Sequence, residues 1–433
     1  MVGQGSHALY NAGAEAEGNA TMTRRVVITG IGMVSPLGND TPSTWAALCA
    51  GKSGVGPITR FDASRHDVRI GAEVKDFDPL AVLDRKLVRR TDRFTHFALA
   101  AALEAQADAK LDIAPIADEV GVLIGSGSGG LWTLEEGFHQ IFERPPDRFN
   151  PFFITMMPAD LAGANVSMLL GARGHNYATV SACATGAHAI GEAAEVIKRG
   201  DADVMITGGT EAGMTPMTIA AFASMHALST RNDDPQGASR PFDADRDGFV
   251  SGEGAGILIL EEMESARARG AHIYAEIVGY AGTADAHHIT DPAPGGSGLA
   301  RAIRRALTKA GLQPTEVDYI NAHGTSTPPN DRNETAAVNA VFGEYAPQLP
   351  ISSTKSMTGH LMGAAGGVEI AFTALALHDG ILPPTINYTT PDPECNLDYV
   401  PNEARRKPIK VAMSESMGFG GHNAVVVLRR VEP

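Results

Sequence analysis

The sequence predicts an α/β protein whose sheets are largely buried. Apolar, β-branched runs that end in glycine alternate along the chain with alanine-rich stretches of helical periodicity. A strand covered by helices on both faces reads as a continuous apolar run, which is the pattern seen here. Glycine supplies 48 of the 433 residues, and much of it lies inside or beside these elements, where helices and strands can then approach closely.

Nine segments carry this pattern most clearly. The expected strands are 24–30, 120–127, 202–209, 317–324 and 423–430, and the expected helices are 96–109, 186–200, 298–311 and 359–380. Two of the helical segments, around Cys183 and around His360, each follow a strand-like end and a polar turn rich in small residues. This similarity indicates a duplicated architecture, with an N-terminal half at 23–271 and a C-terminal half at 272–433.

Composition limits the class of protein. Thirty-five basic against 50 acidic residues give a net charge of −15, which opposes general affinity for nucleic acid. Apolar stretches are interrupted well before the roughly 18 residues that a membrane helix needs. Three cysteines without a CxxC pair suit a reducing cytoplasm and argue against zinc knuckles. We expect a cytoplasmic protein that neither binds nucleic acid nor enters a membrane.

The first 22 residues are small and polar and lack the cationic start and apolar block of a secretory signal. Gly5-Ser6-His7 and a second start-like residue, Met22, fit a leader or tag. We expect this segment to be disordered.

Two short motifs resemble ligand sites but lack the required context. The glycines of 125–130 match a dinucleotide loop formally, yet no acidic residue closes a second strand about 20 residues later. Asp243, Asp245 and Asp247 resemble the start of a calcium loop, but the twelfth position, where a bidentate Glu is required, is Gly254. The sequence therefore predicts neither a nucleotide nor a metal at these positions.

Cys183 lies where a β-rich run ends and a helix of small residues begins. Such a strand-to-helix turn places a thiol at the positive end of a helix dipole, which favours thiolate, and leaves backbone N–H groups free to stabilise an oxyanion. A buried structural thiol fits this segment equally well. Cys49 and Cys395 lie in ordinary helical and loop surroundings.

Two histidines strengthen the catalytic interpretation. His323 and His360 lie in polar, glycine-bounded turns at the ends of predicted elements, which are unusual surroundings for core histidines. Charged and hydroxyl side chains accompany them, namely Lys355, Glu334, Thr325 and Thr327.

Five segments, 180–193, 229–256, 321–334, 352–369 and 418–424, together resemble the signature segments of beta-ketoacyl-[acyl-carrier-protein] synthases, closest to those of type II fatty acid synthesis. The resemblance runs from about Thr23 to the end of the chain. It implies a thiolase-like fold of two similar halves in five layers, α-β-α-β-α, and a homodimer. It further implies decarboxylative condensation of malonyl-[acyl-carrier-protein] with an enzyme-bound acyl group, without a cofactor or metal.

The resemblance also assigns roles to residues. Cys183 would carry the acyl group, and its backbone N–H with that of Phe419 would bind the oxyanion. Neutral His323 and His360 would stabilise the enolate. Lys355 would order His360, with Glu334 as a supporting carboxylate, and Thr325 and Thr327 would bind pantetheine. Phe419 would also gate the acyl pocket.

A basic cluster precedes the helix at 96–109. Its spacing places the side chains on one or two helical turns, where a solvated face is the simple interpretation. The resemblance matches this segment to a docking region for acidic acyl carrier protein. The cluster consists of Arg85, Lys86, Arg89 and Arg90.

The chain departs from the family pattern at four positions. Relatives usually read NSFGFGG where this chain has Glu415 in place of Asn and Met417 in place of Phe. His226 replaces a common Arg, and Ser128 replaces an apolar residue of the acyl pocket. We therefore expect an altered gating turn, an altered entrance contact and an altered chain-length preference.

Three alternatives share part of this pattern. A non-catalytic chain-length-factor-like subunit would lack the thiol, and a degradative thiolase would carry a second cysteine near the carboxyl end. A polyketide-type ketosynthase shares Cys183, His323 and His360, and the sequence leaves that alternative open.

Overall fold

The structure is a computed structural model that describes residues 24–143 and 145–432. The predicted leader or tag at 1–22 lies outside the described residues. None of the described helices is long and apolar enough to cross a membrane.

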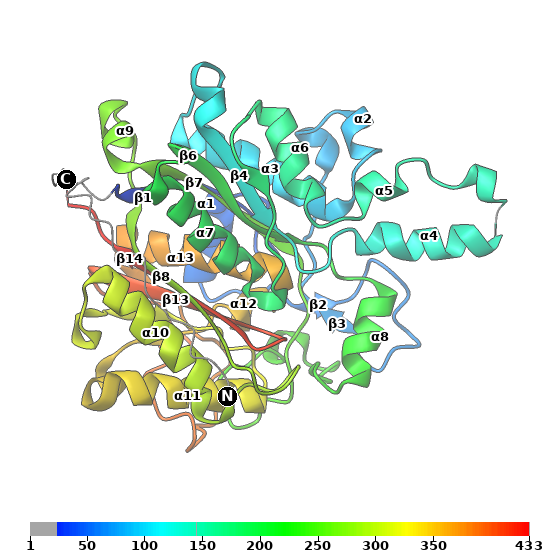
Figure 1. The fold of residues 1–433 in the computed structure, drawn as a ribbon. Helices are drawn as coiled ribbons and strands as arrows, with labels where there is room; N and C mark the ends of the chain where they lie inside the picture. Colours follow the sequence, from blue (N-terminus) through cyan, green and yellow to red (C-terminus); the bar gives the residue numbers. More distant parts are fainter. Residues whose placement is uncertain (1–23, 144, 433) are drawn as a thin grey trace, which may run out of the picture.

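Ten strands form one continuous sheet that divides into two halves of five (Figure 1). In the order in which they lie, the N-terminal strands are β5 (Asn176–Tyr177), β4 (Val120–Gly125), β6 (Val204–Glu211), β7 (Gly254–Glu262) and β1 (Val26–Val34). The C-terminal strands, from the far edge inward, are β10 (Ile351–Ser352), β9 (Tyr319–Asn321), β13 (Val411–Gly418), β14 (His422–Arg429) and β8 (Ala275–Ala284).

The two halves have the same topology. In each, the strands lie in the order third, second, fourth, fifth, first along the chain, and the corresponding pairs are parallel or antiparallel in the same way. They are joined by a short antiparallel pairing of Val26–Ile28 with Ala275–Ile277. The predicted duplication is therefore confirmed at the level of strand order.

Helices complete five layers, α-β-α-β-α, as predicted. The longer helices are α1 (Thr41–Cys49), α3 (Arg93–Ala109), α4 (Leu131–Glu143), α6 (Leu161–Leu170), α7 (Thr185–Arg199), α8 (Pro216–Ser224), α10 (Ser297–Ala310), α11 (Pro328–Phe342) and α13 (Ala365–Asp379). On the outer face of the N-terminal half, α3 packs on β1, β6 and β7, and α6 packs on β4 (Figure 1). Helices α7 and α13 lie between the halves. On the outer face of the C-terminal half, α10 packs on β8 and β14, and α11 packs against α10.

Short elements connect these layers. The short helices are α2 (Arg85–Val88), α5 (Phe153–Met156), α9 (Met263–Ala268) and α12 (Lys355–Thr358), and the two-residue strands β2 (Gly56–Pro57), β3 (Ile70–Gly71), β11 (Ile381–Leu382) and β12 (Arg405–Arg406) form two further small sheets.

The two central helices begin in the same way. α7 follows a 3-10 turn, η4 (Ala182–Ala184), and α13 follows η9 (Met362–Ala364). The first residue of each turn has a left-handed backbone, with φ of 49° at Ala182 and at Met362. Each helix spans 15 residues and ends at a left-handed glycine. Cys183 and Gly363 therefore occupy equivalent positions in the two halves.

All nine predicted elements are present, with shifted ends. The largest difference is at 359–380, where the helix begins only at Ala365 because the left-handed turn at Met362 interrupts it. Similarly, α7 begins at Thr185 rather than at Cys183.

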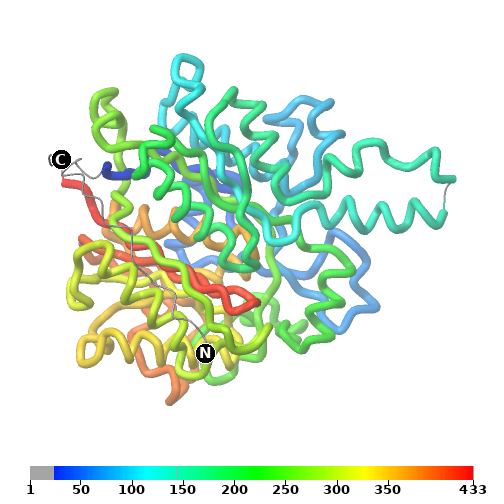
Figure 2. The backbone as a smooth tube through the Cα atoms, viewed as in Figure 1, coloured from blue at the N-terminus to red at the C-terminus, as the bar shows by residue number. Residues whose placement is uncertain are grey.

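One arm leaves the layered body. α4 and α5 extend outward, as the tube in Figure 2 also shows. The arm exposes large apolar side chains, including Phe142 at 85% and Ile154 at 69% exposure.

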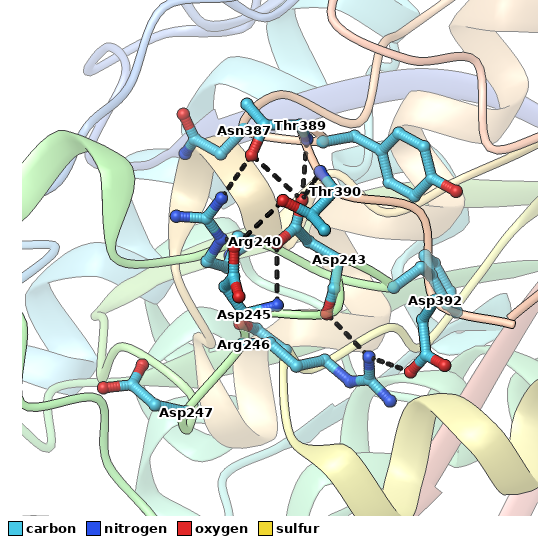
Figure 3. A network of polar contacts seen from close by, with 12 residues as sticks. Arg240, Asp243, Asp245, Arg246, Asp247, Asn387, Thr389, Thr390 and Asp392 are labelled. Carbon is cyan, nitrogen blue, oxygen red and sulfur yellow. Dashed lines mark hydrogen bonds and ion pairs between the residues drawn. The ribbon is translucent and has the colours of Figure 1, made fainter. Parts of the chain in front are cut away.

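The segment that resembles a calcium loop has a structural role (Figure 3). The Asp243 carboxylate accepts hydrogen bonds from Arg240 Nε at 3.0 Å and from the backbone N–H groups of Asp245, Thr389 and Thr390 at 2.6–2.9 Å. These donors hold the carboxylate and fasten two loops that are distant in the sequence.

Candidate active site

A cavity of about 590 Å³ lies where the two halves meet. Cys183 from the N-terminal half and His323 and His360 from the C-terminal half line it together. Other predicted residues on its wall are Ser128, His226, Thr325, Thr327, Met417 and Phe419. The structure therefore gathers residues that are up to 291 positions apart, Ser128 to Phe419 (419 − 128), around one space.

The Cys183 turn is held by close backbone packing. A side chain on Gly418, the last residue of β13, would place its Cβ 2.6 Å from the Ser181 carbonyl oxygen and 3.1 Å from the Cys183 nitrogen. Only glycine fits this contact, because real Cβ atoms do not approach backbone atoms so closely. The next residue, Phe419, consequently lies beside the thiol.

The surroundings of Cys183 oppose ionisation of its thiol. Although part of Cys183 faces the cavity, the surrounding protein raises its pKa to about 12, and the positive charge of Lys355 offsets this only in part. The backbone N–H groups of Phe419 and of Cys183 itself also reach the sulfur and lower its pKa. These backbone N–H groups act in the predicted direction, towards thiolate, but desolvation outweighs them.

The two histidines are neutral. Burial lowers the pKa of both His323 and His360 well below the ordinary value, and Lys355 adds to the effect on each. Their rings are nearly perpendicular, with centroids 5.4 Å apart. His360 Nδ1 accepts the Met362 N–H at 3.3 Å, so its remaining proton is on Nε2.

Lys355 forms a buried ion pair beside the two histidines. Its ammonium group pairs with Glu369 of α13, and both side chains are about 1% exposed. Its charge lowers the pKa of both His323 and His360, and its ordering of His360 stays a prediction. Burial raises the pKa of Glu369 to about 7, and Lys355 opposes that rise.

Glu334 holds the backbone at His323 and also feels the charge of Lys355, which lowers its pKa. Its carboxylate accepts the backbone N–H groups of His323 at 2.6 Å and Gly324 at 2.7 Å. This reach from α11 fixes the turn after β9. Burial raises the pKa of Glu334 to about 7.

The basic cluster lies on the surface and away from the cavity wall. α2 covers Arg85 and Lys86, Arg89 caps its end, and Arg90 lies beyond it. All four side chains are exposed. This short helix of four residues falls within the one or two helical turns predicted. The Arg90 guanidinium lies 5.0 Å from the Phe152 ring centroid, near the arm.

Sequence reasoning missed Glu211, Glu369 and Gly418. The Glu211 carboxylate accepts bonds from Gly127 N–H at 2.8 Å, Ser128 N–H at 3.2 Å and Gly363 N–H at 2.9 Å. The available signal was a single acid inside an otherwise apolar element, as in ITGGTE and GGVEIA. Lone buried acids require partners, so each such residue indicates a polar network.

Comparison with known proteins places the chain in a family. The models for the beta-ketoacyl synthase N-terminal and C-terminal domains match residues 23–266 and 274–389. The 3-oxoacyl-[acyl-carrier-protein] synthase 2 of Staphylococcus aureus is 54% identical over 95% of this chain and 100% of that protein. The synthase 2 of Synechocystis sp. is also 54% identical, over 94% and 99%.

Solved structures agree with this fold. A type II PKS acyl-carrier protein in complex with its ketosynthase gives a TM-score of 0.88 at 39% identity and covers 95% of this chain and 100% of that chain. A beta-ketoacyl synthase from Burkholderia phymatum gives 0.88 at 39% identity, with 94% and 100% covered. The fold is that of thiolase-like condensing enzymes. The chain belongs to the beta-ketoacyl synthase family and is an acyl-transferring enzyme.

Proposed function

We propose that this enzyme elongates acyl chains of fatty acid biosynthesis, by decarboxylative condensation of malonyl-[acyl-carrier-protein] with an acyl group on Cys183. The single observation that carries the proposal is the shared cavity wall of Cys183, His323 and His360. The product is 3-oxoacyl-[acyl-carrier-protein].

The first stage is acyl transfer. The Cys183 sulfur attacks the thioester carbonyl of acyl carrier protein, the carbonyl–sulfur bond breaks, and the pantetheine thiol leaves with the proton given up by Cys183. The N–H groups of Cys183 and Phe419, which reach the sulfur, suit the developing oxyanion. A thiol with a pKa of about 12 reacts only when the substrate is in place to receive its proton.

The second stage forms the carbon–carbon bond. The malonyl carboxylate leaves as carbon dioxide, and the electron pair of the broken bond forms an enolate. Neutral His323 and His360 stabilise the enolate oxygen by donating N–H bonds. The enolate carbon then attacks the acyl-enzyme carbonyl, and the Cys183 sulfur leaves as a thiolate and takes up a proton from solvent.

Substrate groups are assigned by position on the wall. Thr325 and Thr327, whose hydroxyl oxygens lie 2.9 Å apart, bind the pantetheine amides. Ser128 lines the acyl pocket, and Phe419 gates it. The proposed chemistry requires neither a metal nor a cofactor. Its two leaving groups, the pantetheine thiol and carbon dioxide, are both supplied by the substrates.

Acyl carrier protein is the macromolecular partner. The exposed cations Arg85, Lys86, Arg89 and Arg90 suit an acidic surface, and one structural neighbour is a ketosynthase in complex with its acyl-carrier protein. The enzyme acts in the cytoplasm. A homodimer would cover the apolar side chains of the arm and the outer edge of β5.

The test is extension of acyl carrier proteins with malonyl carrier protein by Cys183→Gln. Condensation should fall at least about 10³-fold, because no other group can carry the acyl chain. Decarboxylation should persist through the two histidines. Cys49→Ala, at a half-buried thiol outside the cavity wall, is the matched control. Condensation that survives Cys183→Gln would contradict the mechanism.

A polyketide-type reaction is the second candidate, favoured by the 39% identical PKS ketosynthase. An assay with excess malonyl carrier protein and no ketoreductase distinguishes a fatty acid enzyme from a polyketide enzyme. A fatty acid enzyme should stop after one condensation, whereas a polyketide enzyme should extend its own 3-oxo product.

A further inference from the structure

Glu415 is an unexplained acid behind the active site. It lies on β13, four residues before Phe419 (419 − 415), and is 0% exposed. Side chains alternate along a strand, so Glu415 shares its face with Met413 and Met417. Those methionines pack in the same apolar cluster as Ala337 and Val338 of α11. Glu415 therefore points from β13 towards α11.

No donor of the described residues hydrogen-bonds to either Glu415 oxygen. The group that acts on it most closely is the carboxyl of Glu334, on α11. Glu334 is itself well supplied, because it accepts the N–H groups of His323 and Gly324 and the side-chain amide of Asn330 at 3.3 Å. Two carboxyl groups can hydrogen-bond to each other only when one of them carries a proton.

A count of buried charges in this region gives the same result. Four buried carboxyl groups meet two buried cations. Arg246 pairs with Asp331 at 3.4 Å, and Lys355 pairs with Glu369. Among the described residues, no cation forms an ion pair with the remaining two acids, Glu334 and Glu415, although the charge of Lys355 lowers the pKa of Glu334. Two adjacent, uncompensated carboxylates cannot both remain ionised in a buried site.

The proton belongs on Glu415. Hydrogen bonds from N–H groups stabilise an ionised carboxylate, and only Glu334 receives them. Burial raises the pKa of Glu415 well above its ordinary value, and the charge of Glu334 adds to that rise.

We propose that Glu415 is a positioning residue: an uncharged carboxylic acid that donates its proton to Glu334 and so ties the strand leading to Phe419 to the turn that carries His323. Its consequence for condensation rests on the proposed function, whereas its protonation state does not.

Alkaline pH should break this tie. Loss of the proton would place two negative charges side by side and separate β13 from α11. Several elements around this part of β13 carry other ionisable groups. These groups are His323 after β9, Asp331 on α11, Lys355 on α12, Glu369 on α13, Cys183 in η4, His422 on β14 and Arg246 in the loop before β7. Of these, the histidine at 323 is neutral and burial raises the pKa of the Cys183 thiol, while Asp331 and Glu369 have paired cations.

The experiment compares the wild-type enzyme with Glu415→Gln and Glu415→Asn by infrared difference spectroscopy and thermal unfolding. The wild type should show a C=O band of a protonated carboxylic acid that both variants lose, in addition to any absorption by Glu211 and Glu369, whose pKa values burial raises to about 7 in all three proteins. As the pH rises from the ordinary carboxyl pKa of 4.5 through the raised folded pKa of Glu415, the wild type should lose stability relative to Glu415→Gln, because over that range the folded state holds a proton that the unfolded state has released. kcat should decline over the same range in the wild type and stay level in Glu415→Gln.

Glu276→Gln is the control, since Arg25 and Arg429 pair with Glu276 and keep its pKa low. That variant should leave the acid band unchanged. An acid band identical in wild type and Glu415→Gln would overturn the proposal, as would parallel alkaline loss of stability. Failure of both neutral variants to fold would overturn it too, because a neutral amide should replace a neutral acid. Infrared and unfolding results stand even if condensation itself is not observed.

Discussion

The turn that contains Cys183 (η4) and the turn that contains Gly363 (η9) have the same backbone conformation, but their backbone N–H groups have different partners. Each begins with a left-handed residue and leads into a central helix, and each packs against the end of the fourth strand of the other half. At the Cys183 turn that strand is β13, which ends in Gly418 and leaves N–H groups free at the sulfur. At the Gly363 turn it is β6, which ends in Glu211, whose carboxylate binds the Gly363 N–H.

This difference shows how a duplicated fold acquires one reaction site. The duplication supplies two helix starts with unpaired backbone donors. Glycine at one strand end leaves those donors beside the sulfur, as the proposed oxyanion site requires, whereas glutamate at the other strand end binds them. Chemistry therefore depends on the residue at the strand end as much as on the thiol.

The largest effect should come from Gly418→Ala. The new Cβ would lie 2.6 Å from the Ser181 carbonyl oxygen and push the Phe419 N–H away from the thiol. We expect kcat to fall roughly 10²–10³-fold, the usual result of losing one oxyanion donor. Gly56→Ala, where a Cβ meets nothing within 4 Å, is the control. Unchanged condensation kinetics would show that Phe419 is not such a donor.

Gly363→Ala should disturb the other turn through stability. Its Cβ would meet the Gly127 nitrogen at 2.3 Å and Glu211 Oε2 at 2.6 Å. Overpacking of this kind costs about 1–3 kcal/mol. Thermal unfolding measures the loss. A melting temperature equal to that of the wild type would mean that the two turns are less tightly fixed than their contacts indicate.

Glu211→Gln should change how stability depends on pH. Burial raises the pKa of Glu211 from about 4.5 to about 7. The associated stability is fully present below about pH 4.5 and is lost as the pH rises through about 7, a cost of roughly 3 kcal/mol. Glu211→Gln should remove this slope, although it weakens the bonds to Gly127 and Gly363. Urea unfolding at several pH values provides the test, and equal slopes would contradict it.

The smallest effect should come from Ser128→Ile. Ser128 lies on the loop that Glu211 holds, and its side chain lines the cavity. A larger apolar group should shift the product profile towards shorter chains with little change in stability. Chromatography of the extended acyl carrier proteins measures the shift. An unchanged profile would remove Ser128 from the acyl pocket.

Much of the site was predictable because its residues lie in local motifs. Cys183 after an apolar run, and His323 and His360 in glycine-bounded turns, follow from patterns within a few residues of each. The same holds for the alternating strands and helices. Duplication was visible from the similar segments around Cys183 and His360, although the identical strand order of the halves was not.

The sequence by itself determined the α/β class, the thiol, the two histidines and the family. Tertiary structure alone decided the partners of Lys355 and Glu334, the role of Glu211 and the raised pKa of the Cys183 thiol. The reason is physical: hydrogen-bond partners and desolvation depend on groups brought together from distant positions, as when Glu211 reaches Gly363 across 152 residues. Local pattern specifies which groups a chain carries, but burial determines their charge.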